Sequence, residues 1–398
     1  MPSTETHGGT VEIAAYRVDV EASVIDDLTH RLARTRLAEE PDGAGWDYGT
    51  NAGYLAELVD YWRTGFDWFE QQERLNRLPQ FRASVDGVDV HFAHLRGSGP
   101  NPMPLQLVHG WPSGYPEMTK LAPLLADPGA HGGDADDAFD VVVPSLPGFG
   151  FSGSTGIRGF GYHRAAAALH RVMAEGLGYD RYGLHGTGLG AYVNGWMAFA
   201  HPDAVVGVHT HDPALMPLAS FEPPAPPPTQ AELDFGAYAR EWGAEEGAYA
   251  QLHRTKPQSI GHALNDSPAG LASWLVEKHR SWSDCHGNLE RRYSKDEILT
   301  GATIYWVTGT IASSLRAYFE RVTADPPMEP GRRLPVPTGV AMPRFEPSFP
   351  PRRAPREMID RVHDVRHWVD LPTGGHFASW EEPHAVADSI RAFFRPLR

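Results

Sequence analysis

The first residues that could do chemistry form a glycine-rich turn, LHGTGLGAY, at positions 184 to 192. An apolar stretch precedes the turn and a helical pattern follows it, which predicts a strand, a tight turn and a helix. In one large class of enzymes, the apex of such a turn carries the nucleophile. Here the apex is Gly188, between the small residues Gly186 and Gly190, and glycine has no side chain that could attack a substrate. A shifted frame that makes Thr187 the nucleophile is disfavoured because it places the hydroxyl off the apex.

The same turn does not fit a nucleotide-binding loop. The dinucleotide fingerprint is G-x-G-x-x-G on the first strand-to-helix turn, followed by an acidic residue about 20 positions later. In this chain the third glycine comes one place early, and the turn lies mid-chain. His209 and His211 alternate along a predicted strand, but no carboxylate or cysteine set completes a metal site around them. We therefore expect neither a cofactor nor a metal.

Three further segments carry residues that fit a catalytic site. The turn HGWP, at positions 109 to 112, follows a strand and can offer a backbone N–H to an oxyanion. His376 stands in the glycine turn TGGH, between a late strand and the last helix. Glu346 follows the penultimate predicted strand, where an acid can hold an imidazole in one tautomer. Each has an ordinary structural reading alone, and the chain order of the set indicates a base with an acidic partner.

The elements that position these residues follow a simple order along the chain. Residues 1–95 are predicted to form a helical extension, with helices over 24–37 and 54–78. Strands alternate with helices over residues 96–221, which predicts an α/β fold with a mostly parallel central sheet and helices on both faces. A proline-rich connector, EPPAPPPTQ, then opens a helical region over 222–335, predicted to be a cap inserted after the sixth core strand. Strand and helix patterns return over 336–398.

Composition limits the partners. The 398 residues carry a formal net charge of −15, which argues against nucleic acid and anionic membranes. Cys285 is the only cysteine, so no intrachain disulfide can form and a reducing cytoplasm fits. The polar start MPSTETHGGT is not a signal peptide, and no apolar run has membrane-spanning length. We expect a cytoplasmic protein that acts on a small molecule.

Long stretches of the chain resemble the epoxide hydrolases of the α/β-hydrolase superfamily, in the microsomal-type branch with an N-terminal extension. The resemblance runs almost end to end. Matching stretches include LARTRL, HGWPSGYPEM, PSLPGFGFS, RTKPQSIGHALNDSPAGLASWLVEKHRSWSD, ILTGATIYWVTGTIASSLRAYFE and GGHFASWEEP.

The resemblance implies roles for individual residues. His376 corresponds to the general base and Glu346 to its acidic partner. Tyr249 and Tyr318 match two cap tyrosines that grip the epoxide oxygen and stabilise the alkoxide as the ring opens. The backbone N–H groups of Trp111 and Leu189 match the oxyanion hole.

The departure from the family is Gly188, which stands where the family has the aspartate that forms an ester with the substrate. Without that carboxylate the ester route is closed, since removing such a nucleophile can cost on the order of a million-fold in kcat. Asp212, after the next strand, is a candidate relocated carboxylate, although aspartate at a strand end is usually a turn former.

Three functions remain open at this point. The preferred one is a non-hydrolytic cyclase, in which the tyrosines draw on the epoxide oxygen and His376 deprotonates a nucleophile within the substrate. The second is a hydrolase that activates water directly, and the third is a binding or scaffold pseudoenzyme. The branch resembles tailoring enzymes of bacterial polyketide and enediyne pathways, which favours a polycyclic natural-product intermediate as substrate. The N-terminal extension could serve a homodimer interface.

Overall fold

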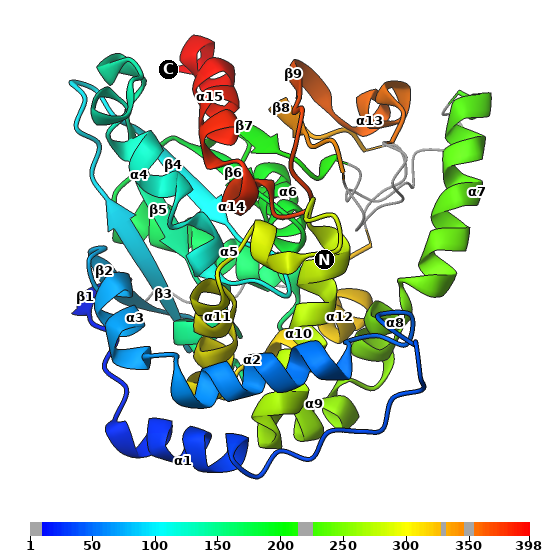
Figure 1. Cartoon of the computed structure of the whole chain (residues 1–398). Helices are drawn as coiled ribbons and strands as arrows, with labels where there is room; N and C mark the ends of the chain where they lie inside the picture. Colours follow the sequence, from blue (N-terminus) through cyan, green and yellow to red (C-terminus); the bar gives the residue numbers. More distant parts are fainter. Residues whose placement is uncertain (1–9, 214–225, 328–331, 346–353) are drawn as a thin grey trace.

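A nine-stranded sheet forms the centre of the computed structural model, which describes residues 10–213, 226–327, 332–345 and 354–398 (Figure 1). The strands, in chain order, are β1 Glu12–Tyr16, β2 Gln80–Val85, β3 Val88–Leu95, β4 Met103–Val108, β5 Phe139–Pro144, β6 Tyr182–Gly186, β7 Val205–Thr210, β8 Pro337–Met342 and β9 Asp364–Asp370. Their order across the sheet is β1-β2-β3-β5-β4-β6-β7-β8-β9. The pairs from β5 onward are parallel, and the three pairs before it are antiparallel. The predicted mostly parallel sheet is confirmed.

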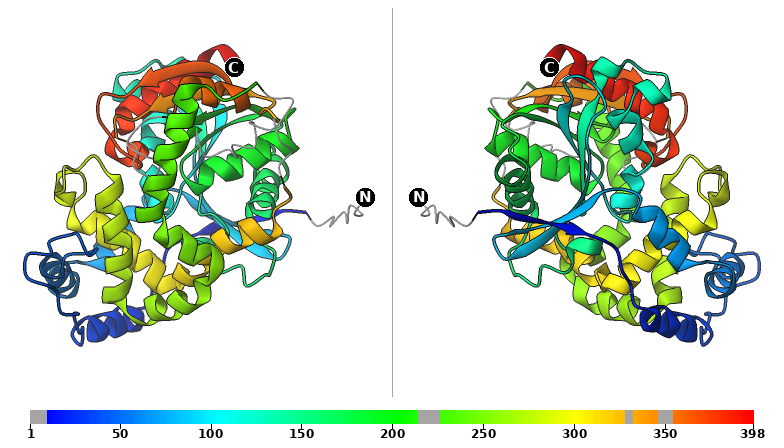
Figure 2. Two further views of the ribbon diagram at one scale, coloured as in Figure 1. Left: turned by 90° about the vertical axis from the view of Figure 1, so that its right-hand side faces the viewer. Right: turned by 90° about the vertical axis from the view of Figure 1, so that its left-hand side faces the viewer.

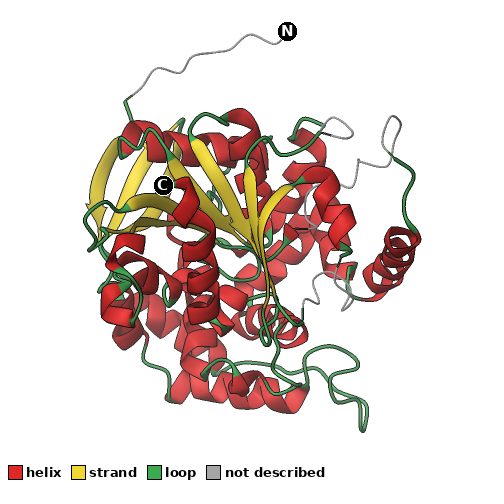
Figure 3. Cartoon of the chain, turned by 90° about the horizontal axis from the view of Figure 1, so that it is seen from above, coloured by secondary structure: helices red, strands yellow, loops and turns green. Residues whose placement is uncertain are grey.

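Helices cover both faces of this sheet because its central strands are apolar on both sides. Every residue of β5 is buried, as expected for a strand between two layers. On one face lie α4 (Leu121–Ala126) and α15 (Pro383–Phe394), which also contact each other. On the other lie α5 (Tyr162–Arg171) and α6 (Leu189–Ala200). Seen from above, the twisted strands run between these helical layers (Figure 3).

The N-terminal extension differs from its prediction. It contains α1 (Ala22–Leu32), α2 (Ala52–Thr64) and α3 (Trp68–Leu75), but it also adds β1 and β2 to the sheet. The helix expected over 54–78 is two helices, because α2 stops at Gly65 and the Asp67 carboxylate caps the next helix by accepting from the N–H groups of Phe69 and Glu70. The predicted helical extension is confirmed, and the two edge strands are an addition that the sequence pattern did not indicate.

The cap is helical, as predicted. It consists of α7 (Gln230–Glu245), α8 (Ala248–Thr255), α9 (Pro257–Asp266), α10 (Pro268–Trp282), α11 (Lys295–Thr308) and α12 (Ile311–Ala324). It follows β7, the sixth strand counted from β2, and lies beyond the carboxyl ends of the parallel strands (Figure 2). The first residues of the proline-rich connector lie outside the described residues, and the exact domain boundaries stay a prediction.

The extension packs on the outside of the cap. The indole N–H of Trp62 in α2 donates to Thr303 in α11 at 3.0 Å, and the Thr50 hydroxyl donates to the carbonyl of Ser273 in α10 at 2.7 Å. The guanidinium of Arg31 in α1 pairs with Asp266 at 3.0 Å.

Within the described ranges, no helix has both the length and the apolar character needed to cross a membrane. A short helix, α13 (Arg356–Val362), precedes β9 at the far edge of the sheet.

Candidate active site

The glycine turn between β6 and α6 has the geometry of a strained elbow. Gly188 has φ 50° and ψ −123°, a conformation that side chains other than glycine rarely adopt. Gly190 lies against the end of the neighbouring strand β4, since a Cβ there would come within 2.3 Å of the Val108 carbonyl oxygen. The predicted strand, tight turn and helix are confirmed, and the apex of the turn carries no side chain.

The HGWP turn meets this elbow directly. A Cβ on Gly110 would lie 3.2 Å from the Cα of Gly188 and 3.5 Å from the backbone nitrogen of Leu189. The imidazole of His109 holds the turn through two hydrogen bonds. Its Nδ1 donates to the Gly110 carbonyl at 2.8 Å, and its Nε2 accepts from the Leu146 N–H at 3.1 Å. The turn that carries Trp111 and the elbow that carries Leu189 are thus in backbone contact, which is the arrangement that a two-donor oxyanion hole needs.

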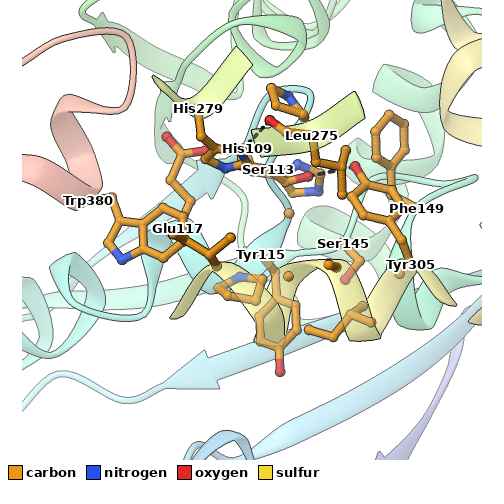
Figure 4. Close-up of a pocket in the computed structure, with 18 of the residues that line it drawn as sticks. His109, Ser113, Tyr115, Glu117, Ser145, Phe149, Leu275, His279, Tyr305 and Trp380 are labelled. Carbon is orange, nitrogen blue, oxygen red and sulfur yellow. Dashed lines mark hydrogen bonds between the residues drawn. The ribbon is translucent and has the colours of Figure 1, made fainter. Parts of the chain in front are cut away.

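A buried carboxyl group, which the sequence reasoning missed, ties these two segments together. Glu117 is 1% exposed and accepts a hydrogen bond from the hydroxyl of Ser113, two residues beyond Trp111. Its other oxygen accepts from the Thr187 hydroxyl at 3.3 Å. Burial raises the pKa of Glu117 to about 7. Figure 4 shows the small apolar pocket that Glu117 and Ser113 line beside the elbow. No motif in the sequence marks Glu117, because its role depends on contacts between distant segments.

His376 lies opposite the elbow apex. Its Nε2 is 3.3 Å from the position that a Cβ on Gly188 would occupy. The backbone holds the ring in place: the His376 N–H donates to the Trp282 carbonyl at 2.8 Å, and its own carbonyl accepts from His211 at 2.9 Å. The turn before it is anchored by buried Glu381, which accepts from the Gly375 N–H at 3.2 Å.

Asp212 stands at the other nitrogen of the same imidazole. Its Oδ2 lies 3.5 Å from His376 Nδ1 and accepts a 2.6 Å hydrogen bond from the Gly188 N–H. The Asp212 N–H is itself bonded to the Thr210 hydroxyl at the end of β7. The candidate relocated carboxylate therefore lies between the imidazole of His376 and the backbone of the apex residue Gly188. In this position it can orient the ring and stabilise its protonated form.

Glu346, the predicted acidic partner, lies outside the described residues. The last described residue before it, Phe345, donates its N–H to the carbonyl of Gly374 at 3.1 Å. That bond brings the end of the β8 loop to within two residues of His376 along the chain. The role of Glu346 stays a prediction.

The two predicted cap tyrosines come together. Tyr249 of α8 and Tyr318 of α12 have ring centroids 6.0 Å apart at an interplanar angle of 81°. The Tyr249 ring also stacks on Trp111 at 5.2 Å and 7°. Burial is the main cause that raises the pKa of both phenols above the ordinary value, so both hydroxyls are neutral hydrogen-bond donors at physiological pH.

The two cap tyrosines, His376 and the apex Gly188 border one cavity of about 280 Å³ between the cap and the elbow. Its described lining comes from the HGWP turn, the elbow, the cap and the histidine turn: Trp111, Gly188, Leu189, Tyr192, Ala239, Trp242, Gly243, Gly247, Tyr249, Ala250, Arg254, Trp282, Tyr318, Arg321, Val322 and His376. His209 and His211, the two histidines that alternate along β7, bond to protein groups: the Nδ1 of His209 is 3.0 Å from that of His185, and the Nε2 of His211 donates to the His376 carbonyl. The cavity therefore joins two phenol side chains, an imidazole and an apex without a side chain.

Comparison with known proteins agrees with this architecture. The family described as "alpha/beta hydrolase fold" matches residues 103–383, and "Epoxide hydrolase N terminus" matches residues 13–118. The chain is thus an α/β-hydrolase-fold enzyme. A relative from Stigmatella aurantiaca is 38% identical, over 97% of this chain and 86% of the relative. Epoxide hydrolase 1 of Oryctolagus cuniculus is 34% identical, over 96% of this chain and 88% of its own length. The protein belongs to the epoxide hydrolase family.

Solved structures show the same relationship. The juvenile hormone epoxide hydrolase of the silkworm Bombyx mori superposes with a TM-score of 0.81 at 25% identity, covering 98% of this chain and 95% of that one. The epoxide hydrolase of Aspergillus niger also gives a TM-score of 0.81, at 26% identity, with 97% of each chain covered. The likeness to these epoxide hydrolases covers 97–98% of this chain, so it includes most of the N-terminal extension.

Proposed function

We propose that this protein opens an epoxide without forming a covalent ester to the enzyme. The observation that carries the proposal is the cavity in which Tyr249, Tyr318 and His376 converge on an elbow whose apex is Gly188. The first three groups supply the acid and base functions of an epoxide-opening site. The apex supplies no nucleophile, so the attacking atom comes from the substrate or from water.

The reaction that we propose is an intramolecular cyclisation. Tyr249 and Tyr318 donate hydrogen bonds to the epoxide oxygen, which weakens the C–O bond and stabilises the alkoxide as it forms. His376 Nε2 removes the proton from a hydroxyl or an acidic C–H of the same substrate, and the freed electron pair attacks the epoxide carbon. The C–O bond of the ring breaks, a new C–C or C–O bond forms, and a tyrosine proton passes to the alkoxide. The imidazolium returns the proton to the phenolate, so the product is an isomer of the substrate.

Asp212 supports the base in this scheme. Its carboxylate, 3.5 Å from His376 Nδ1, stabilises the positive charge that the ring acquires. Glu346 is proposed to share this task from the β8 loop. We also propose that Trp111 and Leu189 direct their N–H groups toward the space beside Gly188.

The cavity favours this reaction because aromatic side chains make up a large part of its described lining. Its wall includes Trp111, Trp242 and Trp282. A polycyclic intermediate of bacterial polyketide or enediyne metabolism would suit such aromatic walls, and the resemblance to tailoring enzymes supports it. Cytoplasmic localisation and a homodimer remain part of the proposal.

Direct hydrolysis is the alternative, because the space next to Gly188 also faces His376 Nε2 at 3.3 Å. A water there could attack the epoxide once deprotonated. A dead scaffold is disfavoured, since binding alone has no need for the paired phenols and the imidazole around one cavity.

The deciding experiment uses a γ,δ-epoxy alcohol, which carries its own nucleophile, in ¹⁸O-enriched water. Mass spectrometry of the product distinguishes the two routes. An unlabelled isomer with a new cyclic ether supports cyclisation, whereas a triol with one heavy oxygen establishes hydrolysis and overturns the cyclase. Tyr249→Phe combined with Tyr318→Phe should lower kcat/KM by about a thousand-fold or more, because two charge-stabilising donors are lost. Unchanged turnover in this double variant would contradict the role of the tyrosines.

A further inference from the structure

One charged group in the cavity wall has no part in the chemistry above. Arg321 lies on the last turn of α12, three residues after Tyr318, and both side chains line the cavity. Residues three apart on a helix share a face, with about 5–6 Å between their Cβ atoms. A substrate group held by Arg321 therefore lies next to an epoxide held by Tyr318.

The guanidinium of Arg321 is held in position by an aromatic ring, but no carboxylate among the described residues balances its charge. Its central carbon lies 3.8 Å from the centroid of the Tyr192 ring, which fixes it by a cation–π contact at the cavity wall. Across the described ranges, Arg321 forms no ion pair with a carboxylate. Asp325 acts on it only from a longer distance, because the Asp325 oxygens accept from the N–H groups of Tyr162 and His163 at 3.1 Å.

A second cation near the tyrosines shows the contrast. The Lys278 ammonium lies 5.2 Å from the centroid of the Tyr249 ring, but Glu277 and Glu246 pair with it at 2.8 and 3.1 Å. Its charge is therefore balanced within the protein. The charge of Arg321 lacks such a partner and faces the cavity.

The charge of the cavity is opposite to that of the molecule. None of the described lining residues is aspartate or glutamate, whereas Arg321 and the exposed Arg254 both belong to the lining. The whole chain has a net charge of −15. A partly buried guanidinium without a carboxylate partner forms strong, charge-assisted hydrogen bonds with a carboxylate or another planar oxyanion.

We infer that the substrate is an epoxide bearing an anionic oxygen group, such as a carboxylate or an ionised phenol, which binds Arg321. This inference rests on the proposed epoxide-opening function and specifies its substrate class. The anionic group lies toward the end of α12, while the epoxide points to Tyr249 and Tyr318. Arg321 is thus a specificity-determining residue in this cavity.

Binding of unreactive probes tests the inference separately from catalysis. Phenylacetate and phenylacetamide have nearly the same shape, and only phenylacetate is charged at neutral pH. Titration calorimetry of the full chain should give a Kd for phenylacetate about tenfold or more below that for phenylacetamide. Arg321→Gln should remove this preference by weakening phenylacetate alone, and Arg321→Lys should retain part of it.

Arg316→Gln is the matched control, because Arg316 lies on the same helix but its guanidinium bonds to Gln258 and Ser154 rather than lining the cavity. It removes one positive charge from α12 and should keep the preference for phenylacetate. The inference is overturned if the wild type binds the two probes equally or binds neither, or if Arg321→Gln weakens both to the same extent. Failure of the proposed function would appear differently, as probe preference without turnover of either phenylglycidate or its methyl ester.

Discussion

At the scale of single residues, the apex of the elbow decides which chemistry the cavity supports. A side chain at position 188 would point at the imidazole, because a Cβ there lies 3.3 Å from His376 Nε2. The same Cβ would lie 3.3 Å from the Cα of Gly110, so the HGWP turn would have to move by a few tenths of an ångström. Glycine relieves both this crowding and the strain of a φ of 50°.

Gly188→Asp should therefore change the product at a cost in stability. The new carboxylate can attack an epoxide and form an ester, which His376 then hydrolyses with water, so labelled diol should appear in ¹⁸O-enriched water. The positive φ should lower the free energy of unfolding by about 1–3 kcal/mol, measured by urea denaturation.

Gly188→Asn is the matched control, because it has the same size and similar strain but no nucleophilic carboxylate. It should show the same loss of stability without diol formation. Equal product distributions for the aspartate and asparagine variants would contradict the assignment of position 188.

Glu117 gives a prediction about pH. Burial raises its pKa from 4.5 to about 7, so the folded protein holds this proton more tightly than the unfolded chain does. The resulting stability is fully present below about pH 4.5 and is lost as the pH rises through about 7. Glu117→Gln cannot ionise. As the pH rises from about 4.5 to 8, the wild type should lose about 3 kcal/mol of unfolding free energy relative to the Glu117→Gln variant. If the unfolding free energies of the two proteins in urea changed with pH in parallel, the raised pKa of the buried Glu117 carboxyl would be contradicted.

At the scale of elements, the cap is joined to the core through the end of α12. Gly161 precedes α5 and has no side chain to cap it, and Asp325 supplies the missing acceptors for the N–H groups of Tyr162 and His163. A Cβ on Gly161 would lie only 2.1 Å from the Asp325 carboxylate, so the glycine makes room for this borrowed cap.

Asp325→Ala should lower the free energy of unfolding by about 1–2 kcal/mol, because the start of α5 loses its cap. It should also raise KM, since Arg321 sits one turn earlier on α12 at the cavity wall. Asp325→Asn keeps one side-chain oxygen and should lose less than the alanine variant in the same urea denaturation. Equal stability of all three proteins would show that the end of α12 does not carry this link.

At the scale of the whole molecule, buried histidines should make the protein sensitive to acid. Six of the buried histidines in the described ranges have a pKa lowered to about 3 or 4, mainly by burial: His91, His109, His211, His253, His279 and His363. The unfolded chain binds their protons first, so stability is full above about pH 6.5 and is lost as the pH falls toward 4.

Each of these histidines contributes about 3 kcal/mol to the loss of unfolding free energy over that window. Their sum outweighs the opposite effect of Glu117 and Glu381, whose carboxyl pKa values are raised by burial. The melting temperature should fall steeply between about pH 6.5 and 5. His91→Gln, which removes one such group, should make the decline shallower. A melting temperature that stays level across this range would contradict the prediction.

Much of the fold could be predicted from the sequence, because the central strands are apolar runs and the turns after them carry glycine and histidine. The position of His376 and the pairing of Tyr249 with Tyr318 followed from the family resemblance. Glu117 and Arg321 could not be predicted, since their roles depend on segments far apart in sequence that meet only in the folded chain.

Strand β1 was missed for a related reason. Its residues EIAAY show no regular alternation of apolar and polar side chains, since the strand lies at the edge of the sheet with most of its surface exposed. Pairing with β2, rather than local pattern, defines it.

The packing of the N-terminal helices against the cap limits how this protein can be recombined. Thr50 and Trp62 bond to cap residues that lie 223 and 241 positions later in the chain. A chimera that exchanges only the cap between relatives would leave these contacts without partners and expose the apolar face of α2. Cap exchange should therefore succeed only when roughly the first 95 residues are transplanted together with the cap. The two segments must be exchanged as one, although they are far apart in sequence.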